Sequence, residues 1–202
     1  MVKIIIFDMG GVISGTDSAI RAIEDELLEK TGVRLFPIKD QPSPRYREFQ
    51  TGKISSEEYF QNLINLSKAK ISVKELINVY KQIYSNVNKF DSKMIKLVKD
   101  LRKKYAIACF SDTTEVHRQI NEENGFFKLF DFSFVSCGLG VTKNEVRAFE
   151  IVIEKLKVKP EDCIFIDDRE GHVERAKSIG IDAIHFQSYE QLVSELKTRK
   201  II

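Results

Sequence analysis

The stretch IIIFDMGGVI, residues 4–13, places an aspartate directly after a run of apolar residues. With the residues before it, the run VKIIIF (2–7) is typical of a parallel strand that is buried on both faces. Burying a carboxylate at the end of such a strand is costly unless an opposite charge meets it. The sequence therefore predicts that Asp8 ends a buried strand and lies beside a positive charge.

Short apolar runs of the same kind recur along the chain and alternate with amphipathic stretches. Further strands are predicted at residues 105–110, 132–136, 163–166 and 183–186. Helices are predicted at residues 92–104, 115–123, 145–157, 172–180 and 188–197. Because strands that alternate with helices connect by right-handed crossovers, we expect an α/β fold with a parallel sheet flanked by helices.

One long region interrupts this alternation, because it contains helical patterns and no convincing strand. The helical patterns cover residues 18–32, 55–68 and 72–86, and the last two begin with a serine cap. Proline-rich residues 36–45 are interpreted as a loop. We predict an all-helical domain over residues 16–90, inserted into an α/β core formed by residues 1–15 and 91–202.

The composition indicates a globular chain with balanced charge. The chain has 202 residues, 43% hydrophobic and 31% charged, with a formal net charge of +2. That charge predicts neither a nucleic-acid-binding protein nor a membrane-surface protein. The three cysteines show no metal-ligand spacing. Their odd number and wide separation argue against a disulfide framework and favour a reducing compartment. No apolar segment resembles a signal peptide or a membrane span, so we expect a cytoplasmic protein, either monomer or homodimer.

Polar side chains follow three of the predicted strands at the point where each strand ends. Asp8 follows the first, Ser111 follows the second, and Asp167 and Asp168 follow a third. The carboxyl ends of neighbouring parallel strands meet in one crevice, where ligands bind. Carboxylates gathered there need a cation, and oxygen ligands favour Mg²⁺. Lys143, in a loop before a helix, could supply a second positive charge.

This set of groups suits phosphoryl transfer. The reaction needs an in-line nucleophile and electrostatic stabilisation of the equatorial phosphoryl oxygens. An aspartate can be that nucleophile and form an aspartyl-phosphate, while a metal ion and a lysine neutralise charge. A serine hydroxyl and backbone N–H groups at a helix N-terminus can hold the phosphate.

The same residues carry a family resemblance. In chain order, FDMGGV (7–12), ACFSD (108–112), Lys143 and FIDD (165–168) resemble the four motifs of the haloacid dehalogenase-like superfamily. The helical insertion resembles the cap of the small-capped branch, which includes sugar-phosphate phosphatases. The resemblance implies a Rossmann-like core with an inserted helical cap, and a Mg²⁺-dependent phosphatase that acts through an aspartyl-phosphate.

The resemblance also implies a role for each matching residue. Asp8 matches the nucleophile, which is also a metal ligand, and the backbone carbonyl of Gly10 matches a second metal ligand. Asp168 matches a direct ligand of the ion, and Asp167 matches one that acts at a distance or through water. The hydroxyl of Ser111, helped by the amide of Asp112, matches the group that holds the phosphate. Lys143 matches the catalytic lysine that links the nucleophile and the phosphate.

Three positions depart from the family pattern. Gly10 stands where most phosphatases of the family carry an aspartate that protonates the leaving group, a contribution worth about 10²- to 10⁴-fold. We therefore expect slow turnover, or a leaving group that needs little protonation. Asp112 stands where asparagine is common, and its side chain is expected to turn toward a substrate hydroxyl or amine. Asn144 follows Lys143 where proline is common, which should loosen that loop.

The sequence thus predicts a phosphatase of a small phosphorylated metabolite, with two alternatives left open. The first alternative is a metal-independent dehalogenase, which also uses a strand-end aspartate but has no need of the pair Asp167 and Asp168. The second is a catalytically weak relative that binds a phosphorylated ligand or a protein partner, which Gly10 and Asp112 keep open. The three histidines are interpreted as structural residues, and His172, just after the acid pair, ranks first among them for approaching the site.

Overall fold

The computed structural model describes residues 2–15, 17–36 and 44–202, which contain one five-stranded sheet. Neighbouring strands are all parallel, in the order β3-β2-β1-β4-β5. The strands are β1 (Ile4–Phe7), β2 (Ala106–Ser111), β3 (Phe132–Val135), β4 (Cys163–Asp167) and β5 (Asp182–His185). Each strand predicted from an apolar run is present, and the central strand is the one that Asp8 follows.

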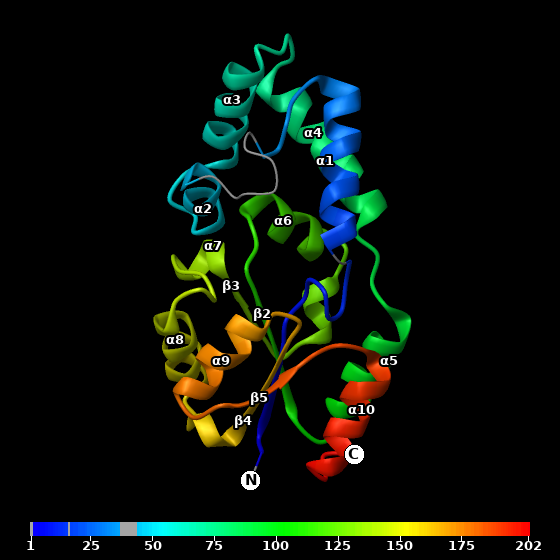
Figure 1. The fold of residues 1–202 in the computed structure, drawn as a ribbon, viewed down its shortest axis with the longest axis vertical. Coiled ribbons are helices and arrows are strands. Elements are labelled where there is room, and N and C mark those ends of the chain that lie inside the picture. The colour runs from blue at the N-terminus through cyan, green and yellow to red at the C-terminus, as the bar shows by residue number, and fades with distance from the viewer. Residues whose placement is uncertain (1, 16, 37–43) are drawn as a thin grey trace.

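Helices cover both faces of this sheet (Figure 1). They are α5 (Ser92–Leu101), α6 (Glu115–Glu123), α7 (Ser136–Leu139), α8 (Val146–Leu156), α9 (Glu170–Ser178) and α10 (Tyr189–Thr198), with 3₁₀ turns η1 (Phe126–Leu129) and η2 (Pro160–Asp162). The predicted helices are present with small changes at their ends. The strand predicted over 132–136 ends one residue earlier, because Ser136 begins the short helix α7.

The apolar run of β1 is buried on both faces because it serves two hydrophobic cores. Ile5 and Phe7 pack in the core that contains residues of α5 and α10. Ile4 and Ile6 pack in the core that contains residues of α8 and α9. A strand in this position needs apolar residues at successive positions, which explains why its sequence does not alternate between apolar and polar.

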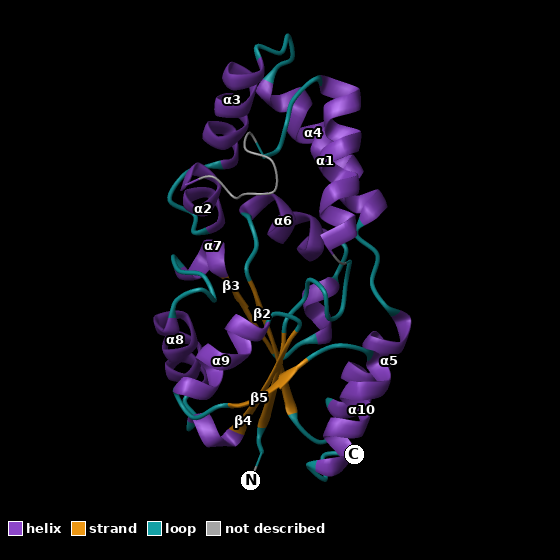
Figure 2. Cartoon of the chain, in the orientation of Figure 1, coloured by secondary structure: helices purple, strands orange, loops and turns teal. Residues whose placement is uncertain are grey.

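The helical insertion lies beyond the carboxyl edge of the sheet (Figure 1) and is helix and loop throughout its described residues (Figure 2). A serine begins α3 through a reciprocal capping box with Glu58, as the sequence pattern predicts. Of the predicted loop 36–45, residues 37–43 lie outside the described part, and Pro44 already belongs to a helix. The helices of the insertion are α1 (Asp17–Thr31), α2 (Pro44–Gln50), α3 (Ser56–Ser67) and α4 (Val73–Val87).

The insertion and the sheet domain meet through α6 and through the two connecting segments. Val116 and Ile120 of α6 are buried in the same hydrophobic cluster as the side chains of the insertion. Ser14 forms an antiparallel bridge with Phe90, so the chain enters and leaves the insertion side by side. Within the described residues, none of the helices is both long and apolar enough to cross a membrane.

Candidate active site

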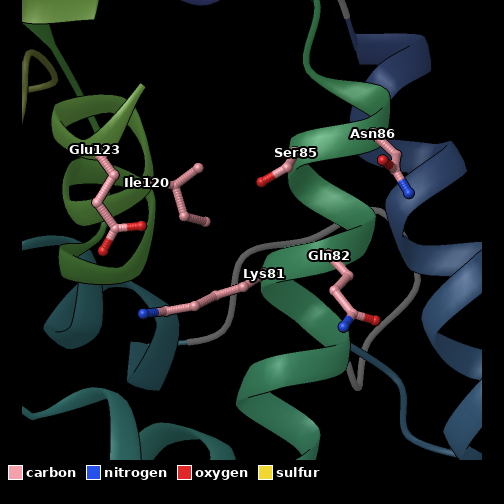
Figure 3. A pocket seen from close by; sticks show the side chains of 6 residues that line it. All are labelled: Lys81, Gln82, Ser85, Asn86, Ile120 and Glu123. Atoms are coloured by element: carbon pink, nitrogen blue, oxygen red, sulfur yellow. The ribbon is translucent and has the colours of Figure 1, made fainter. Parts of the chain in front are cut away.

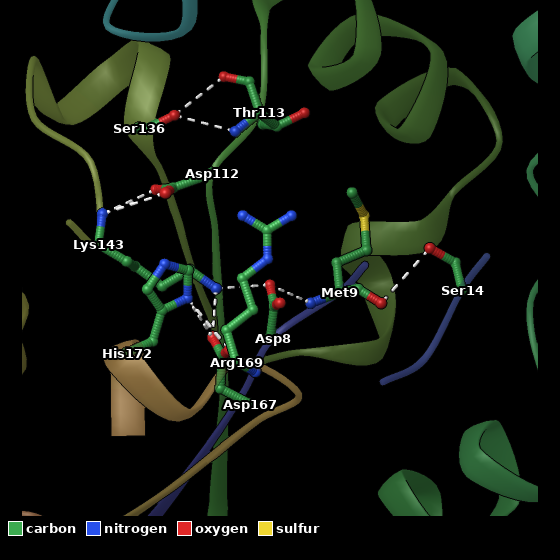
Figure 4. A network of polar contacts seen from close by, with 10 residues as sticks. All are labelled: Asp8, Met9, Ser14, Asp112, Thr113, Ser136, Lys143, Asp167, Arg169 and His172. Carbon is green, nitrogen blue, oxygen red and sulfur yellow. Dashed lines mark hydrogen bonds and ion pairs between the residues drawn. The ribbon is translucent and has the colours of Figure 1, made fainter. Parts of the chain in front are cut away.

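The carboxyl ends of three neighbouring strands bring the predicted site residues together. β1 lies between β2 and β4, so Asp8 emerges beside Ser111 on one side and Asp167 on the other. Asp168 follows at the end of β4, and Lys143 enters from the loop that precedes α8 (Figure 4). The crossovers between the strands, rather than any local sequence signal, create this cluster.

The positive charge expected beside Asp8 is Lys143. Its Nζ lies 2.8 Å from Asp8 Oδ1 and 2.6 Å from Asp167 Oδ2 (Figure 4). The Lys143 side chain is 1% exposed, and its Nζ lies 5.7 Å from the ring centroids of both Phe110 and Phe165. Few lysines are so completely buried, and this one is stabilised by two carboxylates and two aromatic faces.

The two carboxylates beside Lys143 differ in their pKa. Burial raises the pKa of Asp8 to about 7, although Lys143 opposes this shift, and the charges of Asp167 and Asp168 add to it. Burial acts in the same direction on Asp167, but Lys143 and His172 lower its pKa below the usual range. Asp167 is therefore the firmly ionised partner of the lysine. Asp8 needs a further cation to be fully ionised at neutral pH.

Asp167 is held by more partners than the sequence indicates. His172 Nδ1, on α9, lies 3.1 Å from both Asp167 oxygens, and the backbone N–H of Arg169 donates to Oδ1 at 2.8 Å (Figure 4). His172 is 3% exposed and does approach the site, although it contacts Asp167 and not Asp8. With Lys143 included, each oxygen of Asp167 has at least two polar partners.

The carboxylates form a cluster whose chemistry fits a hard divalent cation. Oxygen atoms of Asp8, Asp167 and Asp168 all lie within 4.8 Å of one another. Asp168 Oδ1 is buried and has no hydrogen-bond partner among the described residues. An unpaired buried carboxylate oxygen is costly, and a metal ion would supply its missing partner. An all-oxygen donor set of this kind matches the preference of Mg²⁺.

The two glycines after Asp8 have opposite surroundings. A Cβ on Gly10 would meet nothing within 4 Å, so open space lies where the family usually places an acid. A Cβ on Gly11 would lie 2.1 Å from Asp168 Oδ2, and the backbone there is left-handed, with φ +77°. Gly11 is therefore required for the close approach of the chain to Asp168, whereas Gly10 leaves room for a larger residue.

The Asp112 side chain contacts the protein itself, contrary to the prediction that it turns toward substrate. Its two oxygens accept the backbone N–H of Lys143 at 2.9 and 3.2 Å (Figure 4). A hydrogen bond from a backbone N–H to a charged carboxylate is stronger than one to a neutral acceptor. It joins the Lys143 loop to the end of β2, so the loosening expected from Asn144 is opposed by a contact 31 residues away in sequence.

Two further residues, Ser136 and Tyr46, have surroundings that relate them to the site. Ser136, at the start of α7, binds the backbone of Thr113, two residues after Ser111 (Figure 4). Tyr46, on α2, has its pKa raised to about 12 by burial, while the charge of Arg169 lowers it and that of Asp112 raises it. Tyr46 thus lies within electrostatic reach of the core site. No local signal in the sequence marks Ser136, and for Tyr46 the sequence favours core packing over contact with substrate.

Two cavities of the described structure lie beside the insertion. One of about 350 Å³ lies between α4 and α6 and contains none of the predicted site residues (Figure 3). Its polar wall includes Lys81 and Glu123. A second, of about 660 Å³, is lined by Gly11 and by both connecting segments of the insertion. Neither lining includes Asp8, Asp167 or Asp168.

Comparisons with known proteins identify the family of the chain. The family model for haloacid dehalogenase-like hydrolases matches residues 2–180. The chain is similar to a D-ribitol-5-phosphate phosphatase from Bacteroides thetaiotaomicron, at 25% identity over 191 residues that cover 90% of each chain. It is also similar to Acyl-CoA dehydrogenase family member 10 from Mus musculus, at 26% identity over 96% of this chain but 19% of that protein.

A solved structure has the same fold. It is a HAD family enzyme from Bacteroides thetaiotaomicron, crystallised in complex with magnesium and inorganic phosphate. The TM-score is 0.77, with 19% sequence identity, over 95% of this chain and 99% of the other. The similarity extends over the sheet and the insertion together.

Proposed function

The chain belongs to the haloacid dehalogenase-like hydrolases, and from this premise we propose that it is a Mg²⁺-dependent phosphatase of a small phosphorylated metabolite. The observation that carries the proposal is the buried Lys143 held between Asp8 and Asp167 beside Asp168. The similarity to a D-ribitol-5-phosphate phosphatase supports a sugar or sugar-alcohol phosphate as substrate. In this proposal residues 16–90 act as the cap, and residues 1–15 and 91–202 form the catalytic core.

The proposed reaction has two displacements at phosphorus. In the first, a carboxylate oxygen of Asp8 attacks phosphorus in line, and the bond from phosphorus to the leaving-group oxygen breaks. The Ser111 hydroxyl and the Asp112 backbone N–H hold equatorial oxygens, and the Lys143 ammonium balances their charge. In the second, water attacks the same phosphorus, which releases phosphate and restores the Asp8 carboxylate.

The residues that would hold Mg²⁺ follow from their surroundings. Asp8, the carbonyl of Gly10 and Asp168 are proposed as direct ligands, since Asp168 Oδ1 lacks another partner. Asp167 would act through water, because its oxygens already bind Lys143, His172 and the Arg169 N–H. When bound, the ion supplies electrophilic stabilisation of the phosphoryl oxygens.

Protonation of the leaving group is the step in which this chain departs from the family pattern. Gly10 has no side chain to donate a proton, and the open space at its position leaves room for water. We propose that the substrates hydrolysed fastest have leaving groups that need little protonation, such as anomeric sugar, aryl or acyl phosphates. The acid pair Asp167 and Asp168 supports this phosphatase over a metal-independent dehalogenase, which needs no such pair.

A single set of assays tests the proposal. Wild type and Asp8→Asn are assayed with an aryl phosphate, with and without Mg²⁺, and with a chlorinated short-chain acid. We expect phosphate release that requires Mg²⁺ and disappears in Asp8→Asn, which keeps the shape of the side chain but not its nucleophilicity. Halide release without metal would contradict the phosphatase. So would the absence of turnover on both substrates, which would point to a ligand-binding relative.

A further inference from the structure

The helical insertion touches the core through a backbone contact at the end of α2. Gly52 follows α2 with a left-handed backbone, φ +67°. A Cβ at this position would lie 2.4 Å from the carbonyl oxygen of Cys137, on α7, and 3.3 Å from its carbonyl carbon. Real Cβ atoms do not approach backbone so closely. The insertion therefore contacts α7 so closely that only glycine fits at position 52. This contact between Gly52 and Cys137 is called the seat of the insertion.

Ser136 lies beside this seat and is fully buried. Its Oγ lies 2.7 Å from the carbonyl oxygen of Gln50, in the insertion, and 3.0 Å from the carbonyl oxygen of Thr113, in the core. The backbone N–H of Thr113 donates to the same Oγ at 2.9 Å. A hydroxyl has one proton, so the two carbonyl groups compete for it.

The position of Ser136 connects this competition to the candidate active site. Val135, the residue before it, pairs in register with Ser111. Thr113 lies two residues after Ser111, in the loop that is proposed to hold phosphate. One buried hydroxyl thus contacts both the edge of the insertion and the phosphate-binding loop (residues 111–114).

We propose that Ser136 is a positioning residue that couples the seating of the insertion to the phosphate-binding loop, an inference that rests on the proposed function. With the insertion seated, the Ser136 proton is donated to Gln50, which is the nearer carbonyl. When the insertion lifts, the proton turns to Thr113, so the hydroxyl stays paired in both states. Since coupling is reciprocal, phosphate bound by the loop favours the seated insertion.

Hydrogen exchange with inorganic phosphate as the probe, in Mg²⁺, measures this coupling without turnover. In wild type, phosphate should slow amide hydrogen exchange in the loop 111–114. It should also slow exchange about tenfold in residues 48–54, which belong to the insertion. In Ser136→Ala, protection of 48–54 should be lost while the loop still responds. Protection of the loop alone in wild type would overturn the coupling. No protection of either segment would overturn the proposed function as well.

A matched pair of glycine variants tests the seat itself. Gly52→Ala adds a Cβ that collides with Cys137, so residues 48–54 should exchange fast with or without phosphate. Gly32→Ala is the control, because Gly32 has nearly the same backbone, φ +70°, but nothing within 4 Å of its Cβ. The control should behave as wild type. If both variants lose protection, backbone strain rather than the seat is responsible, and the inference fails.

Turnover gives a second readout. We expect kcat/KM for an aryl phosphate to fall about tenfold in both Ser136→Ala and Gly52→Ala, the size of a typical coupling between sites. The kcat/KM of the double variant should be no lower than that of Gly52→Ala alone, because both changes disrupt the same coupling. Additive losses would show that the two residues act independently, and that result would overturn the coupling.

Discussion

The buried lysine is the residue on which the charge balance of the site depends. Replacing Lys143 by methionine would leave Asp8 and Asp167 buried together without a compensating charge. Removing one partner of a buried ion pair typically costs about 3–5 kcal/mol. We expect urea unfolding to show a loss of stability of this order, together with the loss of phosphatase activity.

A surface lysine provides the control for this change. Lys96 pairs with Asp100 on an exposed helix face, and its side chain is 78% exposed. Lys96→Met should change the unfolding midpoint very little. If the two methionine variants were equally stable, the buried network would not have the energetic importance assigned to it.

Gly10 offers a gain-of-function test, because its Cβ position is empty. Gly10→Asp would place a proton donor two residues after the nucleophile, with room for the side chain. We expect kcat for alkyl phosphates to rise, by up to about 10²-fold, and kcat for aryl phosphates to rise much less. Steady-state assays on paired alkyl and aryl substrates measure the difference.

Gly10→Asn separates proton donation from mere occupancy of this space. It has nearly the same shape as aspartate but does not act as a general acid, so alkyl phosphates should gain nothing from it. An equal gain in both variants would mean that filling the space, rather than proton transfer, raises the rate. Gly11 permits no such test, since its Cβ would collide with Asp168.

At the residue scale, the sequence predicted correctly which side chains meet at the ends of neighbouring strands. Asp8, Ser111 and Asp168 were identified because each follows a recognisable apolar run, and the topology places them together. The partner of Asp112 could not be predicted, because it is a backbone N–H 31 residues away. Such contacts depend on how loops from separate crossovers meet, which no local pattern encodes.

At the element scale, α4 and α6 meet through a partly buried histidine, His117, whose titration should affect stability. Burial lowers the pKa of His117 to about 3, and Tyr80 OH lies 2.5 Å from its Nε2. The folded protein keeps this ring neutral, whereas the unfolded chain binds a proton near pH 6.5. The stability that His117 contributes is therefore complete above about pH 6.5 and is lost as pH falls toward 3, at up to about 1.4 kcal/mol per pH unit.

Glutamine at this position tests the sign of that effect. His117→Gln keeps an acceptor for the Tyr80 hydroxyl but does not titrate. Between pH 6.5 and pH 4, the free energy of unfolding of the variant should depend on pH less steeply than that of wild type, by about one proton. Parallel slopes for the two proteins would show that His117 is protonated in the folded state.

The elements that were missed are the short ones. α2 has seven residues and α7 has four, too few for a helical repeat of apolar residues to stand out. By contrast, α3 has twelve residues and a capping box that is visible in the sequence. The missed helices are the two that meet at Gly52 and Cys137, so the contact between insertion and core was beyond local prediction.

At the scale of the whole molecule, the parallel sheet brings several carboxylates together at its carboxyl edge, so the stability of the fold should respond to a cation. Oxygens of Asp8, Asp167 and Asp168 gather within 4.8 Å, with Lys143 as the nearby positive charge. A cation that binds only the folded state stabilises it by about 2.7 kcal/mol at a hundredfold excess over its Kd. We expect Mg²⁺ to raise the thermal midpoint by a few degrees, and a chelator to reverse the shift.

Two asparagine variants show whether this stabilisation arises at the strand ends. Asp168→Asn removes the charge of an acid whose Oδ1 is buried and unpaired among the described residues, so the response to Mg²⁺ should largely disappear. Asp100→Asn removes an exposed carboxylate of a surface pair and should leave the response unchanged. Because neutralising Asp168 also relieves repulsion among the acids, Asp168→Asn should be more stable than wild type in chelator and less stable in Mg²⁺. This reversal in the relative stability of wild type and Asp168→Asn distinguishes a metal site from a structural carboxylate. If Asp168→Asn kept the response to Mg²⁺, the ion would bind elsewhere.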